Sequence, residues 1–220
     1  MTYDEVIHFL YNSLPVFHRE GKKAYKPGLD NIVTLCDQLN NPQHSFKSLH
    51  IAGTNGKGSS SHFIASILQE HGFKVGLYTS PHLKSFTERI KINGIEVSKE
   101  WVSTFVSEKK NIIQEVSPSF FEWTVAMAFS YFKEQQVDWA IIETGMGGRF
   151  DATNVVRPQV SVITNLSLEH TDYLGSTIKD LAREKSGIIK QKTPVVTGVA
   201  QPSGLRVIQK IAADKSAPLF

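Results

Sequence analysis

The sequence predicts an α/β fold in which a parallel β-sheet carries helices on both faces. Short apolar runs, typical of buried strands, alternate along the 220 residues with longer segments of helical periodicity. A glycine-rich loop at residues 53–58 joins one such run directly to a helical segment. The only departure from this alternation is residues 89–97, where an Asn93-Gly94 turn predicts a small β-hairpin insertion.

The expected helices follow from apolar spacing and from residues that end a helix. Pro15 ends the first helix and Asn40-Asn41-Pro42 ends the second. After the glycine-rich loop, four apolar residues from Phe63 to Leu68 repeat at helical spacing. We expect helices at residues 3–13, 29–39, from the loop to residue 72, and at 99–116, 119–135, 176–190 and 203–213.

The expected strands are short, apolar and separated by loops. The run at 48–52 and residues 74–78 flank one helix and form a βαβ unit. Residues 16–28 lack periodicity and predict an exposed loop, and residues 79–86 predict a polar loop at the end of a strand. Further strands are expected at 137–143, 160–164 and 195–197, with another starting at 218–220.

Composition favours an ordinary globular protein over a nucleic-acid-binding or membrane-spanning one. The net charge is only +3, without a clustered basic face. No apolar stretch reaches the length needed to span a bilayer and the N-terminus lacks a signal-peptide pattern, so we expect a cytoplasmic protein. Cys36 is the single cysteine, which excludes an internal disulfide, and we expect it to pack as a small apolar residue.

The stretch Ile51–Ser61 has the features of a phosphate-binding loop. Glycines let the backbone approach a ligand closely, and the first N–H groups of the following helix point toward an anion. Lys57 adds a positive charge for outer phosphates, and the Ser59 hydroxyl is placed to reach a Mg²⁺ ion held by them. The common pattern has glycine where this chain has Ile51, and serine or threonine where it has Gly58. The alternative interpretation is a glycine-rich turn without a ligand.

Polar side chains follow three of the expected strands, at what a parallel sheet makes one common edge. They are Ser59, Glu143 and His170, and we expect them to bind Mg²⁺. Glu143 follows four apolar residues, and a carboxylate so close to the core needs a cation or several donors. A surface glutamate and a hydrogen-bonded loop histidine are the alternatives. Lys185 alone indicates a solvated helix lysine, although Gly187 two residues later indicates tight packing.

Several motifs together resemble a known enzyme family. They are Gly53–Ser59, Ser80–Leu83 and Glu143–Asn154, with Glu169-His170 and Glu184–Ile188. These motifs are similar to those of the folylpolyglutamate synthase/dihydrofolate synthase family, a branch of the Mur ligase superfamily, and the resemblance covers nearly the whole chain. It implies that residues 1–220 form a Mur ligase-like ATP-binding domain, the P-loop-containing central-domain type. The family's C-terminal domain is then absent from this chain, which ends within the first domain.

The resemblance also implies an activity, which is ATP-dependent amide ligation. ATP would phosphorylate the carboxylate of a folate or dihydropteroate, and L-glutamate would attack the acyl phosphate. The implied cofactors are ATP, Mg²⁺ at two sites and K⁺, in a monomeric protein. The implied catalytic residues are Lys57, Lys185 and His170; the ATP-binding residues are Gly53, Thr54, Asn55, Gly56, Lys57, Gly58 and Ser59; the metal ligands are Ser59, Glu143, His170 and Lys185, the last as a carbamate; and the substrate-binding residues are Ser80, Pro81, His82 and Leu83.

Two other functions fit parts of this pattern. A peptidoglycan-precursor ligase of the same superfamily would have a similar phosphate loop, but we do not expect it to combine Ser80–Leu83 with the long block Glu143–Asn154. A nucleotide-binding module without ligase activity is the other alternative, because the resemblance places part of the active site in a C-terminal domain.

Overall fold

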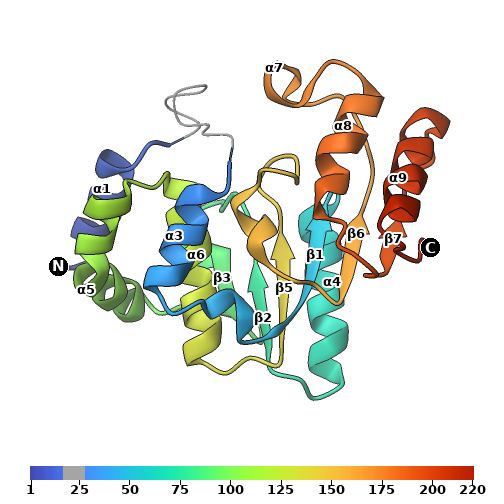
Figure 1. Cartoon of the computed structure of the whole chain (residues 1–220). Coiled ribbons are helices and arrows are strands. Elements are labelled where there is room, and N and C mark those ends of the chain that lie inside the picture. Colours follow the sequence, from blue (N-terminus) through green and yellow to red (C-terminus); the bar gives the residue numbers. More distant parts are fainter. Residues whose placement is uncertain (17–27) are drawn as a thin grey trace.

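The computed structural model describes residues 1–16 and 28–220, and its centre is a seven-stranded sheet (Figure 1). The strand order is β4-β3-β2-β5-β1-β6-β7. Strands β2, β5, β1, β6 and β7 run parallel, and the hairpin of β3 and β4 continues the sheet in antiparallel pairing. The strands are β1 Lys47–Ala52, β2 Val75–Tyr78, β3 Ile90–Ile92, β4 Ile95–Glu96, β5 Trp139–Glu143, β6 Val160–Ile163 and β7 Val195–Thr197. At the chain's end, Leu219 forms one more parallel bridge, with Val195.

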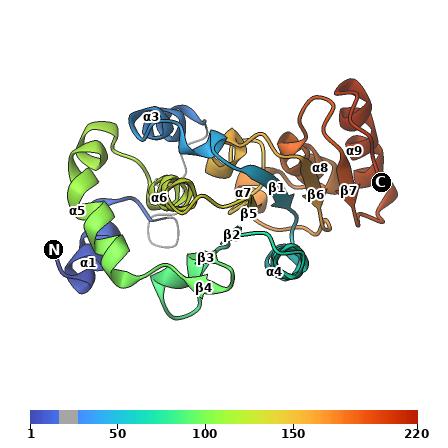
Figure 2. The ribbon, with the colours of Figure 1, turned by 90° about the horizontal axis from the view of Figure 1, so that it is seen from below.

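Helices cover both faces of the sheet, as predicted (Figure 2). One face packs against α4 (Lys57–Glu70), whose Ala65 contacts a cluster that includes Ile141 of β5. The neighbouring residues Ala140 and Ile142 point to the opposite face, because side chains alternate along a strand. That face carries α6 (Phe120–Glu134) and, beyond it, α8 (Ile178–Lys185) with α9 (Pro202–Asp214).

The largest hydrophobic cluster lies on the β2–β5 side of the molecule. Here α1 (Tyr3–Ser13), α3 (Asp30–Gln38) and α5 (Lys99–Val116) pack around α6. Trp123, Phe129 and Phe132 of α6 are fully buried, because the sheet and these helices cover α6 on several sides. Ser119 caps α6 in a capping box with Glu122, and this cap fixes where the helix begins.

Two predicted helices differ from the structure in detail. On α4, Phe63 and Ile67 are 71% and 58% exposed, and the small residues Ser61 and Ala65 face the sheet, which lets the helix lie close to it. The helix expected at 176–190 is shorter, because α8 ends at Lys185 and a 3₁₀ turn, Ser186–Ile188, follows. At that turn the backbone lies against Arg149, so that a Cβ on Gly187 would be 2.3 Å from Arg149 Cα.

Other sequence predictions have simpler outcomes. The predicted loop at 16–28 lies almost wholly outside the described residues. Cys36 is 1% exposed in the large cluster, as expected for a small apolar residue, and burial raises the pKa of its thiol to about 12. Across residues 1–16 and 28–220, no helix has the length and apolarity that crossing a membrane requires.

Candidate active site

The loop between β1 and α4 exposes a row of main-chain donors. Gly53 has a φ of 149° and Gly56, the N-cap of α4, a φ of 79°, and both are conformations that L-residues rarely adopt. Within the described part of the chain, nothing accepts a hydrogen bond from the N–H groups of residues 56–59. These groups lie at the positive end of the α4 dipole, which is an arrangement that binds phosphate.

A second loop, between β6 and α7 (Thr171–Leu174), holds the glycine-rich loop in place. Thr164 Oγ1 donates to Asn55 O at 2.7 Å, and Asn165 Oδ1 accepts from Asn55 N at 2.8 Å. Thr54 N donates to Asn165 O at 3.1 Å. Thr164 and Asn165 had no predicted role, although their position at the end of an expected strand was a usable signal.

Two lysines converge on the carbonyl oxygen of Gly53. Lys57 Nζ donates to Gly53 O and to Thr54 O, both at 3.0 Å. Lys185 Nζ donates to the same Gly53 O at 2.9 Å and pairs with Glu169 Oε1 at 2.6 Å. Lys185 is 1% exposed, and burial lowers its pKa while the contact with Glu169 opposes that shift. The solvated-lysine alternative is therefore wrong, and Lys57 and Lys185 belong to one site.

Glu143 ends β5 and faces the start of α4. It is 4% exposed, and its Oε2 accepts a hydrogen bond from Ser80 N at 3.1 Å. A Cβ on Gly58 would lie 3.7 and 3.8 Å from the two carboxylate oxygens, so the carboxylate borders the phosphate loop. Burial raises the pKa of Glu143, and the Ser80 N–H and Lys57 oppose the rise.

The donor set at this corner fits a magnesium ion. No hydrogen bond joins Glu143 Oε1 or the Ser59 hydroxyl to another described residue. A buried carboxylate oxygen and a hydroxyl beside a phosphate-binding loop are the ligands that Mg²⁺ takes together with phosphate oxygens. These two residues would hold the ion, and their role as magnesium ligands stays a prediction.

The other two predicted metal ligands are arranged differently. His170 precedes α7 with a left-handed backbone, φ 46°. Lys185 is an amine that donates to Glu169, so in this form it is no metal ligand. In the described residues no group of three His, Cys, Asp or Glu side chains is gathered as a metal site. A second Mg²⁺ site at His170 and Lys185 stays a prediction.

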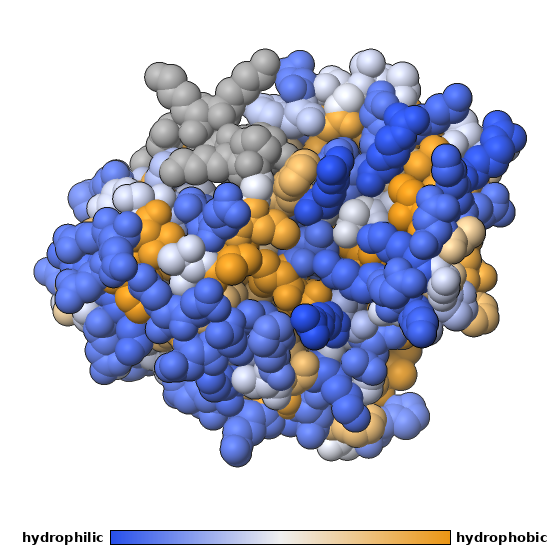
Figure 3. All heavy atoms as spheres, viewed as in Figure 1, coloured by the Kyte–Doolittle hydropathy of each residue, from blue (hydrophilic) through white to orange (hydrophobic). Residues whose placement is uncertain are grey.

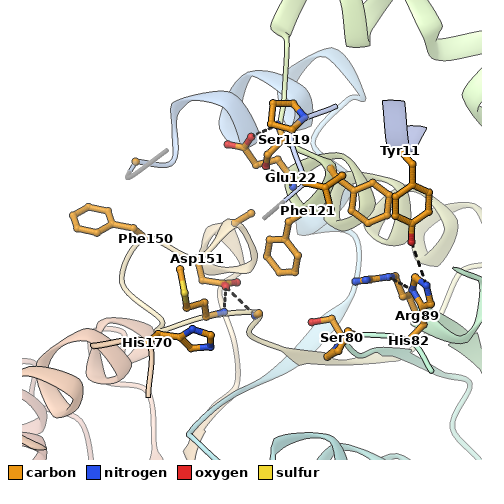
Figure 4. A pocket seen from close by; sticks show the side chains of 18 residues that line it. Tyr11, Ser80, His82, Arg89, Ser119, Phe121, Glu122, Phe150, Asp151 and His170 are labelled. Atoms are coloured by element: carbon orange, nitrogen blue, oxygen red, sulfur yellow. Dashed lines mark hydrogen bonds between the residues drawn. The ribbon is translucent and has the colours of Figure 1, made fainter. Parts of the chain in front are cut away.

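A cavity of about 510 Å³ opens next to this corner, and it has an apolar body with polar walls (Figure 4). Tyr11, His82 and Arg89 lie on one side of it, and Asp151 and His170 on the other. Figure 3 shows apolar surface gathered in the middle of the face that is seen in Figure 1. The apolar lining residues of the cavity are Pro15, Val16, Pro81, Phe120, Phe121, Met146, Phe150 and Ala152.

The predicted substrate-binding motif lies partly on this cavity. Ser80, Pro81 and His82 line it. Leu83 does not line the cavity, and it is 92% exposed to solvent. Ser80 also joins the cavity to the metal corner, since its main-chain N–H binds Glu143.

Arg89, which the sequence analysis did not single out, places a buried cation on the cavity wall. It is 7% exposed, and its Nε donates to His82 Nδ1 at 2.8 Å. The His82 ring is therefore an acceptor at Nδ1, and burial and the nearby Arg89 lower its pKa. Its Nε2 lies 3.2 Å from the Tyr11 hydroxyl. Arg89 makes no ion pair with a carboxylate of the described residues, and its guanidinium carbon lies 5.4 Å from the centroid of the Phe120 ring.

On the opposite wall, Asp151 organises the glycine-rich block that follows β5. Its Oδ2 accepts from Gly145 N at 2.8 Å and from Met146 N at 2.9 Å, and its Oδ1 accepts from Thr153 N at 3.0 Å. Asp151, Gly145 and Met146 all line the cavity. Burial raises the pKa of Asp151, and these N–H groups and the Thr153 hydroxyl oppose that shift.

The sequence of this site matches a known family. The Mur ligase middle domain matches residues 51–217, which include the phosphate loop, Glu143 and Lys185. The chain belongs to the Mur ligase family. The chain is also 45% identical over 208 residues to the dihydrofolate synthase/folylpolyglutamate synthase of Bacillus subtilis, an alignment that covers 91% of this chain and 48% of the relative.

Solved structures agree with this relationship. The folylpolyglutamate synthase of Thermotoga maritima superimposes with a TM-score of 0.89 at 42% identity, covering 99% of this chain and 49% of that one. FolC of Escherichia coli, solved in complex with DHPP and ADP, superimposes with a TM-score of 0.89 at 33% identity, covering 100% of this chain and 53% of that one. The chain thus spans about half the length of the relatives it matches, and corresponds to their N-terminal part. The resemblance and the fold class inferred from the sequence are confirmed.

Proposed function

We propose that this Mur ligase is an ATP-dependent amide ligase that adds L-glutamate to a folate or to dihydropteroate. The observation that carries the proposal is the junction at Ser80. Its main-chain N–H binds Glu143 beside the phosphate loop, and the residue also lines the cavity. A carboxylate at the inner end of the cavity would therefore lie next to the phosphates of a nucleotide bound at residues 53–59. Gly53, Thr54, Asn55, Gly56, Lys57, Gly58 and Ser59 are the proposed ATP-binding residues.

The chemistry follows from that juxtaposition. A substrate carboxylate oxygen forms a bond to the γ-phosphorus of ATP as the bond to the β–γ bridging oxygen breaks and ADP leaves. The amine of L-glutamate then attacks the acyl carbon, the amide forms, and inorganic phosphate leaves with the release of a proton. Main-chain N–H groups of residues 56–59 stabilise charge on the transferring group, since they are fixed before it binds. Lys57 leaves the carbonyls it now contacts and binds outer phosphate oxygens.

Magnesium belongs to the same proposal. Ser59 and Glu143 would hold one Mg²⁺, which neutralises phosphate charge when bound. We propose His170 and Lys185, as a carbamate, for a second ion, with K⁺ as a further cofactor. Support for the carbamate is that Lys185 is buried and its pKa is lowered, because CO₂ adds to a neutral amine. After incubation with ¹³C-bicarbonate, we expect the NMR spectrum of the chain to show a carbamate carbon signal, and we expect the spectrum of Lys185→Arg to lack it.

The cavity supports an aromatic substrate with polar edges. Its apolar lining suits a flat ring, and Arg89 and Asp151 offer opposite charges on opposite walls. The E. coli relative was solved in complex with DHPP, and the 45% identity to a dihydrofolate synthase/folylpolyglutamate synthase supports a folate-type substrate. Ser80, Pro81 and His82 are proposed to contact the substrate from this wall, with Leu83 outside it.

The experiment measures binding and ligation separately. We propose that residues 1–220 form the ATP-binding domain of a longer ligase, since the relatives are about twice as long. The chain alone should bind ATP·Mg²⁺ and dihydropteroate in calorimetry, and should incorporate glutamate only when the remaining part of such a ligase is supplied. Turnover of about one per second by the chain alone, within the usual range for intact enzymes, would refute the need for a second part. If the chain binds ATP but binds neither a folate nor a pteroate, the result would favour the nucleotide-binding module instead. The cytoplasmic location and monomeric state stay predictions.

A further inference from the structure

A fully buried histidine reaches the cavity wall through a chain of hydrogen bonds. His50 lies on β1 and is 0% exposed. Its Nε2 is 2.8 Å from Thr153 Oγ1. Thr153 Oγ1 in turn donates a short hydrogen bond to Asp151 Oδ1, and Asp151 lines the cavity. His50 itself does not touch the cavity, so any effect it has on a ligand passes through Thr153.

The valence of each group determines where the protons lie. Three main-chain N–H groups point at the two oxygens of Asp151, so this carboxylate only accepts hydrogen bonds. The single hydrogen of the Thr153 hydroxyl therefore goes to Asp151, and Thr153 Oγ1 accepts from His50 Nε2–H.

The rest of the His50 ring is consistent with that tautomer. Burial, and then the charge of Lys190, lower the pKa of His50 to about 3, so the ring is neutral and carries one proton. With that proton on Nε2, Nδ1 is a bare acceptor. Nδ1 indeed has no hydrogen-bond partner among the described residues, and an unmatched acceptor is tolerated better than an unmatched N–H.

These hydrogen bonds from His50 to Asp151 hold a particular part of the cavity wall in place. The Thr153 hydroxyl fixes one oxygen of Asp151, and the other oxygen binds the N–H groups of Gly145 and Met146. If the Thr153 hydroxyl turned away, Asp151 would lose one of its four hydrogen bonds, the one that a side chain donates. His50 opposes this, because its N–H donates to a lone pair of Thr153 Oγ1 and favours the orientation in which the hydroxyl hydrogen points at the carboxylate.

We propose that His50 is a positioning residue for substrate binding, which orients the Thr153 hydroxyl and through it the Asp151 carboxylate on the cavity wall. The ligand class is an aromatic heterocycle that packs against the wall formed by Gly145, Met146 and Asp151, and its identity as a pteroate or folate rests on the proposed function. The charged groups near these hydrogen-bonded residues are Lys190, Glu143 and Lys185, and none of them replaces the donor that His50 supplies.

Matched substitutions separate positioning from packing. Glutamine places its amide N–H near the position of Nε2, whereas asparagine reaches only to the position of Nδ1, so His50→Gln should keep the bond and His50→Asn should lose it. Thr153→Ser keeps the hydroxyl, and Thr153→Val removes it. We expect His50→Asn and Thr153→Val each to weaken dihydropteroate binding on the order of tenfold in calorimetry, the effect of losing one buried hydrogen bond. His50→Gln and Thr153→Ser should stay within about threefold of the unaltered chain.

The double variant provides the decisive comparison. If His50 acts through Thr153, adding His50→Asn to Thr153→Val leaves the affinity of the Thr153→Val variant unchanged. Thermal unfolding of every variant shows that it is folded. Additive losses, or equal losses in His50→Gln and His50→Asn, would overturn the proposal and show that His50 contributes only packing.

A measurement without ligand keeps this test apart from the proposed function. ¹⁵N NMR of the imidazole should show the neutral Nε2–H tautomer of His50, and His50→Asn should shift the amide signals of Gly145 and Met146 while His50→Gln leaves them in place. The Nδ1–H tautomer, or no shift in His50→Asn, overturns the proposal. If the unaltered chain binds neither dihydropteroate nor folate, the proposed function fails, and the NMR result still decides the role of His50.

Discussion

Replacing Gly53 by alanine tests how strongly the phosphate loop depends on its contact with Thr164. An L-residue with a φ of 149° is strained by about 1–3 kcal/mol. The added Cβ would also lie 1.8 Å from Thr164 Oγ1, so the hydroxyl has to turn away. It then loses its hydrogen bond to Asn55 O at 2.7 Å, which stabilises the fold by about 1 kcal/mol. We expect Gly53→Ala to lower the free energy of unfolding by about 2–4 kcal/mol.

Gly56→Ala is the matched control, because it shares the unusual backbone without the steric clash. Its φ is 79°, and an added Cβ meets nothing within 4 Å, so only a backbone term of about 1–2 kcal/mol applies. Urea denaturation followed by circular dichroism measures both variants, and calorimetry with ATP measures the loop. Adding Thr164→Ala to Gly53→Ala should recover part of the loss, since the closest atom is removed. If Gly53→Ala is no more destabilising than Gly56→Ala, the contact with Thr164 does not restrain the loop.

Three further predictions concern charged groups of the site. Lys57→Ala should lower ATP affinity at least tenfold while the fold stays intact, because one charge on the outer phosphates is lost; unchanged affinity in calorimetry would remove the phosphate-loop assignment. Glu143→Gln and His170→Ala should weaken ATP binding more with Mg²⁺ than without it, and equal losses would mean that both residues are structural. Glu88 accepts from the N–H groups of residues 83–85 at 2.7–2.8 Å, and these bonds lower its pKa to about 2 from the usual 4.5. The stabilisation that Glu88 gives to residues 83–85 is therefore complete above pH 4.5 and is lost as the pH falls toward 2. The NMR signal of the Lys84 amide should shift in that pH window, and it should not shift there in Glu88→Gln.

The fold class was predictable because each strand, loop and helix carries a local signal. Apolar runs, the spacing of Phe63 to Leu68 and the Asn93-Gly94 turn all depend on neighbours in the sequence. Strand order was not, because periodicity contains no information on which strands pair. That β5 lies between β2 and β1 is a result of tertiary packing, in which Ile141 joins the cluster under α4 and Ile142 joins the one around α6.

The sequence predicted those site residues that belong to a motif. It did not predict the features of the site that depend on a long-range contact. Glu143 was expected to need a cation or donors, and it receives the Ser80 N–H beside the phosphate loop. The Glu169 partner of Lys185 and the buried charge of Arg89 were not expected. Both depend on how loops from separate strands approach one another, and the charged residues of a loop have no periodicity that would show which of them become buried.

The pairing of β1 with β5 affects when the site can exist during folding. Ile51, which leads into the phosphate loop, lies opposite Glu143, although the two residues come from different halves of the chain. Every segment between them, including α4, β2, the hairpin, α5 and α6, has to be synthesised and excluded from that position before the two strands meet. Non-local parallel pairing of this kind is slow, because the entropy of closing the intervening chain opposes it before the contact is made. A nascent chain that stops short of β5 therefore contains the complete glycine-rich loop but lacks the carboxylate that borders it, and the candidate site is complete only when the middle of the sheet closes.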